Sequence, residues 1–190
     1  MEKRFIGLFG SFLCLYGIFS AIKFGNVFWY TPFTIGGTLF LGYLNYNQKN
    51  ENILTNLEKN PKRILKIYLI YILMALIIEY IGRFTLNLWT YEQFTKNQVI
   101  IHFFLIGYPL GFSFIYESFT LIKKRVKSFN QALMITSLVN AFLHEIPNTF
   151  AWAWTYAIPS GFEIFKINIW VIIGWLILIE IPIIVNQRMR

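Results

Sequence analysis

Two glutamates in apolar stretches, Glu79 and Glu145, are each followed by the same aromatic phrase. Trp89 begins one WTY triplet ten residues after Glu79, and Trp154 begins the other nine residues after Glu145. A carboxyl group in an apolar pocket can transfer protons, and Trp and Tyr ring faces attract cations. The repeated phrase therefore predicts acid–base chemistry, with Glu79 and Glu145 as the catalytic acids.

The residues expected to bind a substrate around these acids are aromatic or polar: Trp89, Tyr91, His102, His144, Asn148, Trp154 and Tyr156. Glu117 and Glu180 follow later in each copy as possible secondary acids. Structural interpretations stay open beside the functional ones. Trp and Tyr form belts at membrane interfaces, and Arg83, four residues after Glu79, is placed for an ion pair. Glu117 and Glu180 lie near the inner surface, where Lys and Arg can neutralise them.

Metal chemistry has little support in the sequence. Glu79, His102, His144 and Glu145 could gather in one outward cluster with zinc-ligand chemistry, but no HExxH or comparable spacing is present. We therefore predict no metal site, and the residues indicate no particular cofactor. All nine acidic residues are glutamates, which argues against the Asp-rich, magnesium-dependent sites of prenyl-diphosphate or CDP-alcohol enzymes.

The elements that must position these residues are membrane helices. Hydrophobic residues make up 56% of the 190-residue chain and charged residues only 14%, about half of what soluble domains carry. Apolar runs near the length of a bilayer crossing predict an all-α, polytopic integral membrane protein with six transmembrane helices. The expected spans are Phe5–Ile22, Val27–Tyr46, Ile64–Gly82, Gln98–Ile122, Gln131–Phe150 and Ile164–Val185.

Basic residues predict the orientation. With the N-terminus inside, 13 of the 17 Lys and Arg residues fall in inner segments and 4 in outer ones. The positive-inside rule then predicts a multi-pass protein of the cell membrane with both termini cytoplasmic. The net charge of +8 lies in segments flanking the spans, which does not fit nucleic-acid binding.

An internal repeat groups the six spans into a single transmembrane domain of three outward-pointing helical hairpins, approximately 1–63, 64–128 and 129–190. The second and third units share the acid-then-WTY phrase, whereas the first keeps only FWYTP at Phe28–Pro32. Membrane repeats often form a site at their interface. We therefore expect Glu79 and Glu145 to approach each other in one outward-facing cavity.

The second unit resembles the small membrane carotenoid cyclases, the heterodimer-type lycopene β-cyclase family. The similarity rests on an acid, a glycine three residues on, a W-x-Y phrase, and a proline followed by an acid and a phenylalanine. In this chain these are Glu79, Gly82, Trp89–Tyr91, Pro109 and the Glu117–Phe119 segment. The resemblance implies protonation and deprotonation of a polyene through a carbocation.

Three functions remain open from the sequence. The first is an enzyme acting on an isoprenoid or another lipid, such as a cyclase or isomerase. The second is a small-molecule transporter or substrate-binding membrane subunit, with prolines permitting helix breaks. The third is a structural or regulatory membrane protein. The expected partners are a membrane lipid or an apolar small molecule, together with a second copy or another membrane subunit.

Overall fold

The computed structural model describes residues 3–158 and 161–189, and most of them are helical. The first half contains α1 (Lys3–Phe24), the 3₁₀ turn η1 (Val27–Trp29), α2 (Tyr30–Asn47), α3 (Ile53–Lys59), α4 (Pro61–Glu79) and the π-helical η2 (Tyr80–Thr85). The second half contains β1 (Trp89–Thr90), α5 (Lys96–Val99), the π-helical η3 (Ile100–Gly107), α6 (Tyr108–Arg125), α7 (Phe129–Ala151), β2 (Thr155–Tyr156), β3 (Glu163–Ile164), β4 (Ile167–Asn168) and α8 (Ile169–Arg188).

Four helical stretches among the described residues are long and apolar enough to cross a membrane. They are Lys3–Phe24, Pro61–Thr85, Lys96–Arg125 and Ile169–Arg188. The predicted all-helical class with several membrane helices is thus confirmed. The expected second and fifth spans form α2 and α7, but neither is among these four stretches. The buried polar residues of α7 lower the hydropathy of this helix, which is one physical reason why it is not among the four.

The structure differs from the sequence analysis at two places, the start of the sixth span and the segment before the third span. The sixth span was expected to begin at Ile164, but Glu163–Ile164 pairs with Ile167–Asn168 in a short hairpin and α8 begins only at Ile169. The Asn168 side chain ends the hairpin by accepting from the Trp170 N–H, which caps α8. The short helix α3 was not expected; it begins where Asn52 accepts from the Thr55 N–H.

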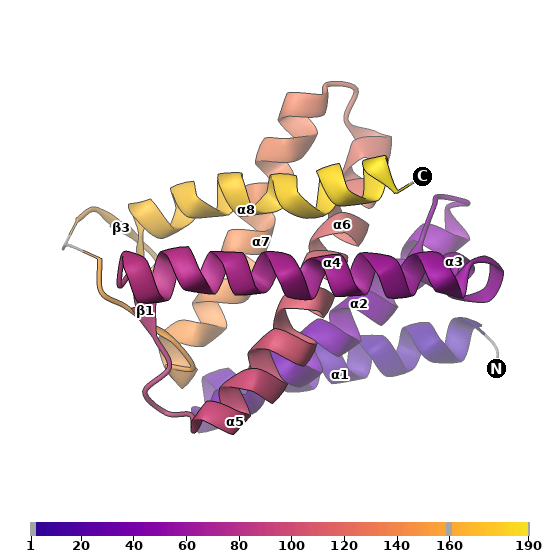
Figure 1. Cartoon of the computed structure of the whole chain (residues 1–190). Helices are drawn as coiled ribbons and strands as arrows, with labels where there is room; N and C mark the ends of the chain where they lie inside the picture. Colours follow the sequence, from indigo (N-terminus) through magenta and orange to yellow (C-terminus); the bar gives the residue numbers. More distant parts are fainter. Residues whose placement is uncertain (1–2, 159–160, 190) are drawn as a thin grey trace.

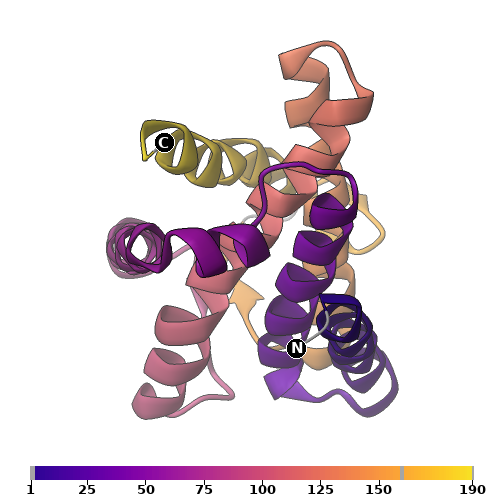
Figure 2. The ribbon, with the colours of Figure 1, turned by 90° about the vertical axis from the view of Figure 1, so that its right-hand side faces the viewer.

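Helix α6 lies in the middle of the fold and contacts α2, α4, α7 and α8. Figure 2 shows α4 and α8 on one side of it and α1 and α2 on the other. In Figure 1, α1 begins and α8 ends near α3, whereas β1 and β3 lie at the opposite end of the molecule. The close approach of α1 to α2 depends on glycines, because a Cβ at Gly10 would lie 2.8 Å from the Gly36 carbonyl oxygen.

Proline and π-helical turns shape the helices next to the acids. Pro109 cannot donate a backbone hydrogen bond to Leu105, four residues earlier, and the wide turns of η3 end just before it. The freed Leu105 carbonyl accepts a hydrogen bond from the Tyr68 hydroxyl of α4. A second helix thus satisfies the backbone group, as the apolar interior of a membrane requires.

Candidate functional site

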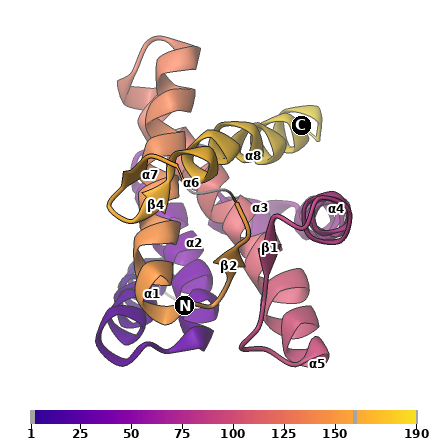
Figure 3. The ribbon, with the colours of Figure 1, turned by 90° about the vertical axis from the view of Figure 1, so that its left-hand side faces the viewer.

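The two WTY phrases pair with each other. β1 and β2 form an antiparallel pair in which Trp89 lies opposite Tyr156 and Thr90 opposite Thr155. The two threonine hydroxyls are 2.8 Å apart and hydrogen bonded, and Figure 3 shows the two strands side by side. The pairing joins the second unit of the predicted repeat to the third at the end of the molecule away from α3.

Glu79, at the end of α4, lies in a cage of aromatic donors. Its Oε1 accepts from Trp89 Nε1 at 3.1 Å, from the Tyr91 hydroxyl at 2.6 Å and from the Tyr108 hydroxyl at 2.6 Å. The residue is only 1% exposed. Three donors on one oxygen hold the carboxyl group in a single orientation and stabilise negative charge on it.

The second oxygen of Glu79 is different. Oε2 is buried and has no hydrogen-bond partner, and its nearest cation is Arg83 Nη1 at 3.9 Å. The predicted ion pair is therefore present, although this distance is too long for a hydrogen bond. Each hydrogen-bonding group in the cage donates to Oε1, and none donates to Oε2.

Tyr91 lies outside the apolar helices and remains a donor. Burial, together with the negative charge of Glu79, raises the pKa of the Tyr91 phenol well above its usual value of 10. The phenol therefore keeps its proton at neutral pH and donates a hydrogen bond to Glu79. Its ring also packs against Phe103, with ring centroids 4.2 Å apart.

Gly82 makes room for the cage. A Cβ at this position would lie 2.8 Å from Cζ2 of Trp89, with two other ring atoms nearer still. The indole therefore lies directly on the backbone of η2, where only glycine leaves space. The chain turns back after η2 through Asn87, whose φ of 50° lies in the left-handed region.

A groove reaches Glu79 from the outer surface of the helices. It encloses about 560 Å³ between α4, η2 and η3, and apart from Glu79 its lining is apolar or aromatic: Leu76, Ile77, Tyr80, Ile81, Phe84 and Phe104. Most of these side chains are exposed, and in a membrane helix exposed apolar side chains face lipid. The groove thus lies on an exposed apolar surface and includes the caged acid in its lining.

Glu145, in α7, has a matching cage. Its Oε1 accepts from the Tyr156 hydroxyl at 2.8 Å and from Trp175 Nε1 at 3.0 Å, and its Oε2 accepts from Trp154 Nε1 at 3.3 Å. It is 3% exposed. In contrast to Glu79, both of its oxygens have partners.

The donors of the two cages lie at nearly the same sequence distances from their acids. The donors come 10, 12 and 29 residues after Glu79 and 9, 11 and 30 residues after Glu145. Sequence reasoning found the first two donors of each set and missed the third, Tyr108 and Trp175. The signal was available, because an aromatic residue stands at nearly the same distance after both acids.

Asn148 hydrogen bonds to the backbone of the second phrase. Its Oδ1 accepts from the Trp154 N–H at 3.2 Å, and its Nδ2 donates to the Trp154 carbonyl at 2.9 Å. These bonds fold the chain back after α7, whose end is marked by Trp152 with a φ of 53°. Trp154 is thereby held above Glu145.

The two histidines do not join the acids in one cluster. His102 Nδ1 is 2.9 Å from the Thr31 hydroxyl, and His144 Nδ1 is 3.0 Å from the Tyr30 hydroxyl. Within residues 3–158 and 161–189, no three His, Cys or Glu side chains form a group that could hold a metal ion. The histidines instead link α2 to η3 and to α7.

The aromatic phrases share one buried cluster. Trp29, from the degenerate first copy, packs on Trp154 with ring centroids 5.9 Å apart, and Tyr30 packs on it at 5.1 Å. Tyr91 and Phe103 belong to the same cluster. Trp29, Tyr91 and Trp154 are buried, rather than facing outward as an interfacial belt would.

The two possible secondary acids, Glu117 and Glu180, lie in different surroundings. Glu180 is exposed on α8. Glu117 is buried in α6, where Oε2 accepts from Asn45 Nδ2 at 2.6 Å and Oε1 from the Ile53 N–H at 2.6 Å. Neither acid lies in the cages of Glu79 and Glu145. The neutralising Lys or Arg expected for Glu117 is not among its partners in the described part of the chain.

Comparison of the chain with protein families, curated proteins and solved structures finds no match. The geometry of the two cages, the groove and the buried acids is therefore the basis for any functional assignment.

Proposed function

We propose that the protein is a membrane enzyme that acts on an isoprenoid or another apolar lipid by acid–base catalysis, with Glu79 as the reacting acid. The observation that carries the proposal is the asymmetry of the Glu79 carboxyl group. One oxygen is fixed by three donors, and the other has no hydrogen-bond partner beside a lipid-facing groove.

The chemistry that suits this arrangement is an isomerisation. In its protonated form, with the proton on Oε2, Glu79 transfers that proton to a carbon–carbon double bond, which leaves a carbocation on the substrate and a carboxylate on the protein. A second double bond of the substrate closes a ring on that cation, and the carboxylate removes a proton from a neighbouring carbon. Product and substrate have the same formula, so no oxidant or further reactant is required.

The cage supports each step. Tyr91, Tyr108 and Trp89 stabilise the carboxylate that forms after proton transfer, because all three donate to the same oxygen. Aromatic faces near the groove favour the carbocation. The apolar lining excludes water, which would otherwise trap the cation.

Glu145 has a positioning role in this proposal. Both of its oxygens are occupied by aromatic donors, and β1–β2 pairing connects its cage to that of Glu79. It therefore fixes Tyr156 and Trp154, against which the first phrase is held. The catalytic role expected for both acids is assigned to Glu79 alone.

The test is mass spectrometry of isoprenoid lipids from a host that accumulates a linear carotenoid. Wild type, Glu79→Gln, Glu145→Gln and the exposed-acid control Glu180→Gln are compared at matched protein levels. We expect a product isomeric with the host lipid in wild type and control, and at least a 100-fold loss in Glu79→Gln. An unchanged lipid profile with folded wild-type protein refutes the enzyme, and loss confined to Glu145→Gln at unchanged stability moves the acid to that position.

A further inference from the structure

A second pocket lies near α3, at the end of the molecule away from the WTY pair. It encloses about 270 Å³ between α2, α3, α4 and α6, with Asn186 of α8 at one margin. Isoleucines and leucines make up about half of its lining. The rest includes three tyrosine rings, Tyr68, Tyr71 and Tyr116, and the carboxyl group of Glu117.

Glu117 brings a buried acid to this pocket without a counter-charge. Its two partners, the Asn45 amide and the Ile53 N–H, are neutral donors. None of the ion pairs in the described part of the chain includes Glu117. A carboxylate has about four lone-pair positions, so two remain after these bonds. A buried carboxylate without a cation is costly, and a cationic ligand would remove that cost.

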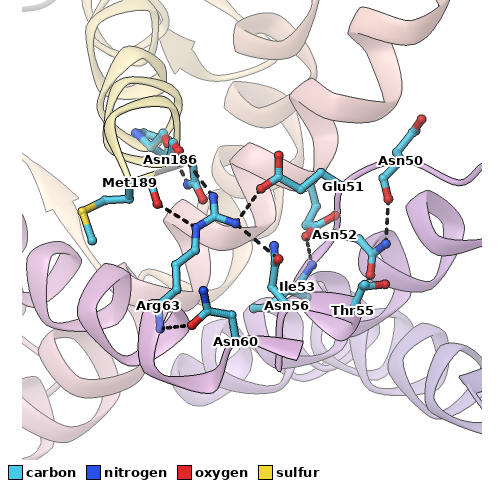
Figure 4. A network of polar contacts seen from close by, with 12 residues as sticks. Asn50, Glu51, Asn52, Ile53, Thr55, Asn56, Asn60, Arg63, Asn186 and Met189 are labelled. Carbon is cyan, nitrogen blue, oxygen red and sulfur yellow. Dashed lines mark hydrogen bonds and ion pairs between the residues drawn. The ribbon is translucent and has the colours of Figure 1, made fainter. Parts of the chain in front are cut away.

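Arg63 lies next to the pocket, because it donates to Asn56 and Asn186 of the lining. Figure 4 shows its guanidinium between Glu51, Asn56 and the end of α8. It donates to Glu51 at 2.7 Å, to the Asn56 side chain at 3.2 Å and to the Met189 carbonyl at 3.0 Å. Arg63 is thus engaged by other acceptors and does not neutralise Glu117.

The lining next to Arg63 is polar. Asn186, whose carbonyl accepts from Arg63, donates through its side chain to the Tyr71 hydroxyl at 2.5 Å. The pocket therefore combines an apolar wall, aromatic faces and one unpaired acid. Aromatic rings and a carboxylate are the groups that recognise alkylammonium and related cations.

We propose that this pocket binds a lipophilic cation, with the charge of the ligand beside Glu117 and its apolar groups against α2 and α4. The ligand class is an amine or onium ion with bulky apolar substituents. This site is separate from the groove at Glu79. It is where small-molecule binding or transport, the second function left open by the sequence, would take place.

The test is equilibrium binding of radiolabelled tetraphenylphosphonium to purified protein in detergent. We expect saturable binding by wild type that falls at least 10-fold in Glu117→Gln and is unchanged in the exposed-acid control Glu180→Gln. Glu79→Gln should also bind normally. Neutral tetraphenylmethane should not compete, because it has the shape of the probe without its charge.

A second variant keeps the test decisive if Glu117→Gln does not fold. Ser113 lines the pocket, and its hydroxyl bonds only to the Pro109 carbonyl of its own helix, so Ser113→Phe fills the space with little loss of polar contacts. It should abolish binding at near wild-type stability. Absence of binding by wild type, equal binding by Ser113→Phe, effective competition by tetraphenylmethane, or loss only in Glu79→Gln would each overturn the proposal.

Discussion

Replacing Gly82 by alanine should disrupt the Glu79 cage through one methyl group. The added Cβ would overlap the indole of Trp89, which would have to move off the backbone of η2 and away from Glu79. Overpacking of this kind costs about 1–3 kcal/mol. The lost hydrogen bond to a charged acceptor costs about 1.5–3 kcal/mol. The better helix propensity of alanine offsets about 1 kcal/mol.

The net loss should be about 1.5–5 kcal/mol, which corresponds to a Tm lower by roughly 3–20 °C for a chain of this length. Cys14 is the only cysteine and is partly buried, so a maleimide dye that fluoresces on reaction with its thiol reports unfolding in detergent. Gly174→Ala is the matched control, because no heavy atom lies within 4 Å of a Cβ there. If Gly82→Ala matched or exceeded the Tm of Gly174→Ala, the packing of Trp89 on Gly82 would be refuted.

Three further changes test how the site is held. In a Cys14→Ser background, Thr90→Cys and Thr155→Cys together should form a disulfide in the folded protein, because directly paired residues lie within bridging distance; failure to cross-link on oxidation contradicts the pairing. Asn148→Ala removes two buried hydrogen bonds to the chain beside β2 and should cost about 2–3 kcal/mol, measured as a lower Tm. Arg63→Met breaks a largely buried ion pair and should cost about 1–3 kcal/mol, whereas Lys3→Met breaks an exposed pair and should lower the Tm less. Equal effects of the two methionine variants would contradict the buried position of the Arg63–Glu51 pair.

The helices were predictable because long apolar runs leave few alternatives to helix in a membrane. The start of α8 was not, because Ile164 and Ile167 are as apolar as a helix start requires, while the turn through Phe165 and Lys166, both with positive φ, depends on backbone geometry. Periodicity carries no signal for such a turn when neither residue is glycine or asparagine.

The acids with their WTY partners were predictable from spacing alone, since the phrase occurs twice. The mutual pairing of the phrases was not, because a strand of two residues has no detectable alternation. The burial of His144 against Tyr30 was also beyond the sequence, because the two residues are 114 positions apart. The asymmetry between Glu79 and Glu145 likewise depends on side-chain directions that only the fold determines.

The central claim is that Glu79, but not Glu145, lines an apolar groove and has one carboxyl oxygen without a hydrogen-bond partner. Labelling with the lipid-soluble reagent dicyclohexylcarbodiimide, followed by peptide mass spectrometry, tests it directly because the reagent modifies carboxyl groups reached from an apolar phase. Glu180, exposed on α8, is the internal positive control. We expect modification of Glu79 and Glu180 with Glu145 unmodified, and Glu79→Gln should lose only the first label. Equal modification of Glu145, or a labelled Glu180 with Glu79 untouched, would contradict the account.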